Sequence, residues 1–99
     1  MEVNGYKIEP RADLRVANLQ ETNLAGTNLQ EANLQEANLA GTNLQEANLA
    51  GTNLQETNLF GANLRKANLT GAKLTEAGSR QAKWDESTVW PEGFTPPKR

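Results

Sequence analysis

The leucines of this chain recur with a period of five residues. All thirteen fall on one lattice: Leu14, Leu19, Leu24, Leu29, Leu34, Leu39, Leu44, Leu49, Leu54, Leu59, Leu64, Leu69 and Leu74. The residue before the leucine is asparagine in eleven units, and the residue two before it is always alanine or threonine. The repeating unit is therefore [Ala/Thr]-Asn-Leu followed by two variable residues.

A period of five fits neither a regular helix nor a flat strand. In a helix, successive leucines would step by about 140° and spiral around the whole surface. In a strand, they would alternate between the two faces. A short extended segment followed by a turn at the two variable residues directs every leucine inward, with the alanine or threonine beside it. The glycines Gly26, Gly41, Gly51, Gly61 and Gly71 all stand at the second variable position, where a type II turn starting at the leucine requires a positive φ. The pattern predicts an all-β solenoid.

Composition narrows the functions that we expect. The 99 residues suffice for one domain, and 12 acidic against 10 basic residues leave a net charge of −2, which attracts nucleic acid or an anionic membrane weakly. The chain has no cysteine and no histidine, and so lacks the thiolate nucleophile and the commonest general base and metal ligand. Residues 1–10 contain no apolar run, so we expect no signal peptide there, and no run of about 18 apolar residues occurs in the printed sequence. We expect a cytoplasmic protein that is not an enzyme, holds no cofactor or metal, and binds neither nucleic acid nor membrane.

The units between Ala12 and Glu86 resemble the pentapeptide-repeat family, whose pattern is A(D/N)LXX. The resemblance implies a right-handed quadrilateral β-helix with four pentapeptides per coil and about four coils; the sequence alone does not define the number four. A unit starting at Ala82 places Trp84 on the lattice, and Val89 and Phe94 also fall in register. The flanking segments 4–10 and 90–94 resemble those of short members of the family from photosynthetic bacteria. A consensus design is the alternative, which these irregular flanks disfavour.

The flanks predict caps on the two ends of the solenoid. We expect an N-terminal cap at 1–11, the pentapeptide-repeat β-helix at 12–86, and a C-terminal cap and tail at 87–99. Tyr6 and Ile8 would cover one end, and Trp84, Trp90 and Phe94 the other, because open solenoid ends expose their core and unpaired strand edges. We accordingly expect a monomer or a weak end-to-end dimer.

The outward positions suggest a candidate protein-contact surface. With four units per coil, Glu36, Glu56 and Glu76 stack into one acidic column. Phe60, on a different face of small residues, is interpreted as the only large apolar residue at an outward repeat position. The asparagine ladder and the inward threonines are expected to be structural. The predicted function is a small rigid protein-interaction module that binds an unidentified protein partner. The alternative, implied by the family, is a DNA mimic that binds DNA gyrase.

Overall fold

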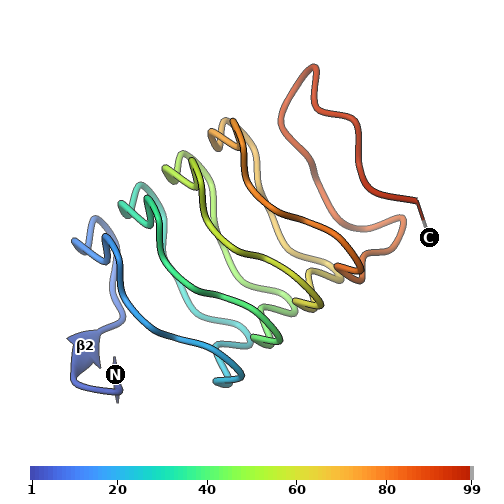
Figure 1. The fold of residues 1–99 in the computed structure, drawn as a ribbon. Coiled ribbons are helices and arrows are strands. Elements are labelled where there is room, and N and C mark those ends of the chain that lie inside the picture. The colour runs from blue at the N-terminus through green and yellow to red at the C-terminus, as the bar shows by residue number, and fades with distance from the viewer. Residues whose placement is uncertain (99) are drawn as a thin grey trace.

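The computed structural model describes residues 1–98, which form a rod of stacked coils measuring 33 × 23 × 22 Å. The chain winds in a right-handed sense from an N-terminal hairpin to a C-terminal tail at the opposite end (Figure 1). The hairpin pairs strand β1 (Glu2–Val3) with strand β2 (Tyr6–Lys7) in antiparallel register. Its two-residue turn, Asn4-Gly5, has positive φ at both positions, as the right-handed twist of a hairpin favours.

Hydrogen bonds between coils show that each coil contains four units. Parallel bridges join residues twenty positions apart on every side of the rod, for example Asn33 with Asn53 and Asn38 with Asn58. The N–H of Leu54 donates to the Lys73 carbonyl at 2.8 Å, and the N–H of Lys73 donates to the Thr52 carbonyl at 2.9 Å. The same two bonds recur around the rod, and the prediction of a quadrilateral β-helix of about four coils is confirmed.

Each corner of the coil is a turn that starts at the leucine, as predicted. The N–H three residues later donates back to the leucine carbonyl, as from Ala47 to Leu44 at 3.0 Å. The second variable residue has a positive φ whether it is glycine or not; Gly41 has 67°, Glu46 has 65° and Val16 has 62°. This is the backbone of a type II turn. The repeat therefore imposes a left-handed conformation on side chains that pay a steric cost for it.

The leucines form one continuous core along the axis of the rod. They are buried together with the alanines and with Thr42, Thr52 and Thr57. The buried hydroxyl groups are satisfied, because Thr42 donates to the Leu19 carbonyl and Thr57 to the Leu34 carbonyl, each at 2.7 Å. The inward assignment of leucine and threonine is confirmed.

The lattice shifts by one residue near the C-terminus, so the predicted registers of Val89 and Phe94 are both wrong. Phe94 closes a turn instead, with its N–H donating to the Pro91 carbonyl at 3.2 Å. Asn63 pairs with Lys83, but Asn68 pairs with Val89, twenty-one positions away. Val89 points outward and is 47% exposed, and Trp90 takes the leucine position. In a regular corner, a backbone carbonyl accepts a hydrogen bond from the N–H of the stacked residue in the coil beneath. Here the Asp85 carboxylate replaces that carbonyl and accepts the hydrogen bond from the Lys66 N–H at 3.1 Å. The aspartate side chain thus accommodates the inserted residue.

Candidate functional site

The residues proposed for protein contact lie on one side of the rod. Residues 56–60 run extended between two corners, with Thr57 and Leu59 inward and Glu56, Asn58 and Phe60 exposed. Alternation along an extended segment requires this arrangement. The same rule applies to each coil. We call this surface the Phe60 side, and its outward residues are Val16, Asn18, Gln20, Glu36, Asn38, Ala40, Glu56, Asn58, Phe60, Glu76, Gly78 and Arg80. The acidic column and Phe60 are therefore at opposite edges of one surface, not on separate faces as expected.

The acidic column stands on a corner with a fixed backbone. Glu36, Glu56 and Glu76 are exposed and have φ values of 62°, 60° and 61°. The N–H of Glu36 donates to the Gln55 carbonyl and that of Glu56 to the Thr75 carbonyl, both at 3.0 Å. The three carboxylates thus project from equivalent positions in successive coils, into solvent.

Phe60 is an exposed aromatic side chain on an ordered backbone. It is 45% exposed. Its N–H donates to the Asn58 Oδ1 at 3.0 Å, and its carbonyl accepts from the Gly41 N–H at 2.8 Å. Ala40 occupies the equivalent position in the coil beneath and leaves that part of the surface flat. An aromatic ring beside a small residue on a rigid support suits contact with a protein surface.

Val16 corrects the expectation that Phe60 is the only large apolar residue at an outward repeat position. Val16 is 69% exposed and occupies the corner beneath Glu36 in the acidic column. A positive φ is rare for a β-branched residue, because both Cγ atoms crowd the backbone. The sequence contained the signal, since Val16 is at the second variable position of its unit.

The asparagine ladder is structural, as predicted. In all eleven Asn-Leu units, the asparagine Oδ1 accepts the N–H two residues later, at 3.0–3.1 Å. Asp13 makes the equivalent bond and a 2.8 Å ion pair with Arg15. The hydrogen bonds from Arg15 lower the pKa of the Asp13 carboxyl to about 2. At Asp85, burial raises the pKa, but hydrogen bonds from Lys66, Ser87 and Thr88 outweigh it, so that the pKa is lowered.

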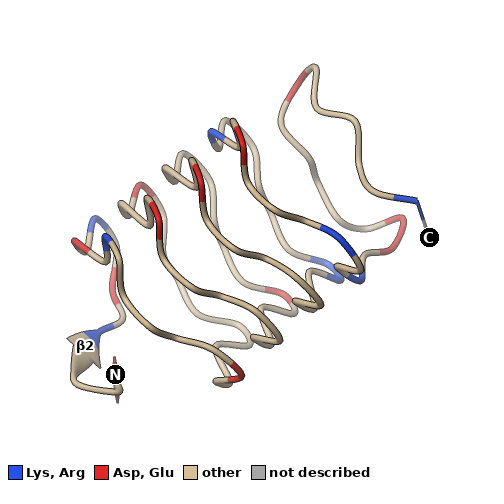
Figure 2. Cartoon of the chain, in the orientation of Figure 1, with Lys and Arg blue, Asp and Glu red and all other residues tan. Residues whose placement is uncertain are grey.

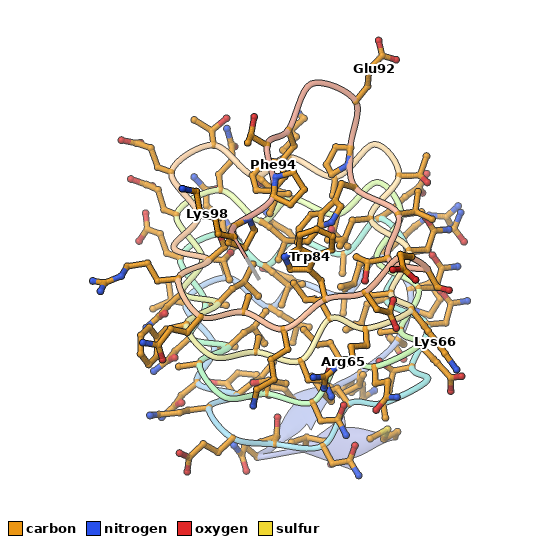
Figure 3. The ribbon with its side chains drawn as sticks, turned by 90° about the vertical axis from the view of Figure 1, so that its right-hand side faces the viewer. Arg65, Lys66, Trp84, Glu92, Phe94 and Lys98 are labelled. Atoms are coloured by element: carbon orange, nitrogen blue, oxygen red, sulfur yellow. The ribbon has the colours of Figure 1, made fainter. Side chains whose placement is uncertain are left out.

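The flanking aromatic residues lie against the two ends of the core. Tyr6 is half-buried and packs on it beside buried Ile8. At the other end, Trp84 and Trp90 meet edge to face at 5.9 Å, and Trp90 stacks on Phe94 at 5.1 Å. The Trp84 Nε1 donates to the Pro97 carbonyl at 2.8 Å and holds the tail across this end. Figure 3 looks onto this end, with Trp84 and Phe94 over the rod and Glu92 projecting away.

Charge is distributed unevenly along the rod. Residues 1–60 contain three basic and eight acidic side chains, whereas residues 61–99 contain seven basic and four acidic ones. Figure 2 shows the acidic positions recurring in successive coils and basic positions in the last coil and tail. Among residues 1–98, no group of three metal-ligating side chains could hold an ion, and no helix could cross a membrane.

Comparison with known proteins identifies the repeat. Residues 11–45 and 42–77 match a family model described as pentapeptide repeats, with eight copies. Among solved structures, the chain is similar to a pentapeptide repeat protein from the cyanobacterium Cyanothece 51142, with 43% identity over 82% of this chain and 62% of that chain and a TM-score of 0.48. This chain thus spans less than two thirds of that protein's length.

Two further solved structures are similar. A pentapeptide repeat protein from Nostoc Pcc 7120 is 37% identical over 89% of this chain and 82% of that chain, with a TM-score of 0.46. One from the Arabidopsis thaliana thylakoid lumen is 26% identical over 71% of this chain and 52% of that chain, with a TM-score of 0.47. No curated protein matches. Because these TM-scores are below 0.5, membership of the family is shown by the match of residues 11–45 and 42–77 to the pentapeptide-repeat family model.

Proposed function

The chain belongs to the family of pentapeptide repeats, and from this premise we propose that it is a non-catalytic, rigid interaction module that binds a protein partner through the Phe60 side. The observation that carries the proposal is Phe60 itself, 45% exposed on a backbone hydrogen-bonded to Asn58 and Gly41. An aromatic anchor of this kind can dominate the energy of a protein interface.

The surroundings of Phe60 support a flat contact with complementary charge. The small side chain of Ala40 leaves the surface next to Phe60 flat. The column of Glu36, Glu56 and Glu76 lies along the opposite edge of the same side. A partner with an apolar socket at one edge of its contact surface and a row of basic side chains at the other edge would match both features. The three carboxylates are exposed to solvent, whereas catalysis requires a concave site that excludes water. A binding role therefore suits this surface better than an enzymatic one.

A DNA mimic that binds DNA gyrase is the second candidate. The acidic column favours it, because stacked carboxylates repeat along the rod as phosphates do along a strand. The basic residues of 61–99 oppose it, since an imitation of DNA requires negative charge along the whole surface. We therefore rank protein contact through Phe60 first.

We also propose that the protein is cytoplasmic, which fractionation of the source cells would test.

Site-directed photo-crosslinking tests the proposal. Benzoylphenylalanine replaces Phe60 in one preparation and Gln30 in a matched control. Gln30 is exposed at the same position of its unit on the diagonally opposite corner. In lysate of the source organism, we expect one discrete crosslinked protein with the probe at 60 and none with the probe at 30. Equal crosslinking at both positions would show that the Phe60 side is not selective.

A further inference from the structure

At the C-terminal rim of the rod, one strand position in the ladder of backbone hydrogen bonds between coils is unfilled. One coil below, the N–H of Leu54 and the carbonyl of Thr52 both bond to Lys73. At the rim, the equivalent groups are the N–H of Leu74 and the carbonyl of Ala72, and neither has a hydrogen-bond partner among residues 1–98. The N–H of Glu76 is likewise unpaired within this range, although that of Glu56 donates to the Thr75 carbonyl.

The chain does not fill this position because it leaves the lattice just before reaching it. The insertion beside Asp85 shifts the register by one residue. The next turn then runs from Pro91 to Phe94, whose N–H donates to the Pro91 carbonyl at 3.2 Å, with a φ of 83° at Gly93. A regular corner would have started at Trp90. The loop 91–94 therefore rises away from the coil beneath, as the loop at the top of Figure 1 shows.

The gap between the loop and the last coil is a groove of about 350 Å³. One wall is formed by residues 72–75 and the other by residues 91–94. Ala72 is 6% exposed and Leu74 8% exposed, whereas Leu54 and Thr52 in the coil beneath are fully buried. The groove thus combines a short apolar floor with a backbone donor and acceptor spaced as in the ladder.

We propose that this groove binds an extended segment of a partner protein by β-strand addition. One residue of the segment donates its N–H to the Ala72 carbonyl and accepts the Leu74 N–H at its own carbonyl, as Lys73 does with Thr52 and Leu54. Its neighbours then point inward, onto Ala72 and Leu74. The segment therefore has a small residue before the bridging residue and an apolar one after it. This site deepens the proposed role in protein binding and does not involve Phe60; it shares with the Phe60 side only the corner residue Glu76, through its backbone N–H.

Lys73 specifies the bridging residue. The outward column beneath it holds Asp13, Asn33 and Asn53, and Lys73 ends the column as an exposed cation. No carboxylate among residues 1–98 forms an ion pair with it. An acidic bridging residue would stack directly on the ammonium group. The structure thus favours a segment of the form small–acidic–apolar.

The unliganded protein provides the first test. Amide hydrogen exchange measured by NMR should be faster at Leu74 and Glu76 than at Leu54 and Glu56, which are paired equivalents one coil below. Equal protection of the two pairs of amides would show that the N–H groups at the rim are already hydrogen-bonded, and would overturn the proposal. Protection of Leu74 that grows with protein concentration would overturn it too, because a second copy would then be the occupant.

The second test is a peptide titration followed by the same NMR signals. The probe is acetyl-Ala-Asp-Leu-Thr-Gly-amide, and binding should shift and protect the Leu74 and Glu76 amides. N-methylation of the probe's aspartate removes the donor to the Ala72 carbonyl and should weaken binding about tenfold. No shift at the rim, shifts confined to the first coil, or equal binding of the methylated probe would each overturn the proposal. Crosslinking at Phe60 would stand in all three cases.

A charge exchange isolates the contribution of Lys73. Replacing the probe's aspartate with lysine should weaken binding about two- to fivefold, as for an exposed ion pair. K73E should reverse that preference. K83E is the matched control, because Lys83 is exposed at the equivalent outward position on another side of the same coil, and it should leave the preference unchanged. An unchanged preference in K73E would refute the acidic assignment.

Discussion

Leu44→Ala measures how firmly each coil is held by its neighbours. Leu44 is fully buried in the middle of the stack, between the coils of Leu24 and Leu64. The substitution removes three carbon atoms from the core, at about 0.8 kcal/mol each, or about 2.4 kcal/mol of transfer free energy. The cavity adds about 1–2 kcal/mol, because the coils above and below are fixed by the ladder and cannot collapse into it. We expect a total loss of about 3.4–4.4 kcal/mol.

Two comparison variants make this value interpretable. Leu74→Ala, at the 8% exposed rim, should cost about 1.5–2.5 kcal/mol, because only one coil packs against Leu74. Gln45→Ala, at a corner, should change the free energy of unfolding by no more than about 0.5 kcal/mol. Urea unfolding followed by circular dichroism gives all three values. Equal losses for Leu44→Ala and Gln45→Ala would refute the assignment of leucine to a closely packed interior.

Four further predictions concern three altered chains and one assay of the unaltered protein. Val16→Gly should raise the free energy of unfolding by about 0.5–1 kcal/mol, because glycine adopts the φ of 62° without strain; a loss of stability in urea would contradict this. Asp13 has a folded pKa of about 2, below its unfolded value, so its contribution is present above pH 4 and is lost as the pH falls toward 2. In thermal unfolding measured over a range of pH, Asp13→Asn should reduce the decrease in melting temperature between about pH 4 and pH 2. An unaltered decrease would show that the pair with Arg15 does not contribute to stability. Deletion of residues 87–99 should produce association in light scattering, because Trp84 and the last coil lose their cover; a monomer with unchanged melting would show that the tail is no cap. A gyrase supercoiling assay should show no inhibition at low micromolar protein. Inhibition that Glu56→Lys abolishes would instead favour the DNA mimic.

The fold was readable from the sequence because one physical requirement repeats in every unit. Each unit must direct Leu inward and turn at the next two residues, and a five-residue period allows only that solution. The number of units per coil was not readable, because no twenty-residue modulation distinguishes one side from another. The twenty-residue spacing between Asn33 and Asn53 appears only in the inter-coil hydrogen bonds.

The local errors arose where the period is broken or incompletely applied. The five-residue period predicts Val89 in register, because Trp84 fits the lattice. However, three residues instead of two separate Trp84 from Thr88, which takes the inward position. The columns of equivalent corners predict that Phe60 and Glu56 belong to different faces, because they belong to different corners of the coil. Alternation along residues 56–60 would have placed both on one side. The rim groove was not predictable, because it depends on the path of the loop 91–94.

An affinity measurement on the crosslinked partner tests the proposed function most directly. The purified partner is titrated against the unaltered chain, Phe60→Ser and Gln30→Ser, with binding followed by calorimetry. Loss of a central aromatic anchor should cost about 2 kcal/mol, or about thirtyfold in Kd, whereas Gln30→Ser should leave Kd within about twofold. Equal affinity of Phe60→Ser and the unaltered chain would contradict the assignment of the Phe60 side as the contact surface.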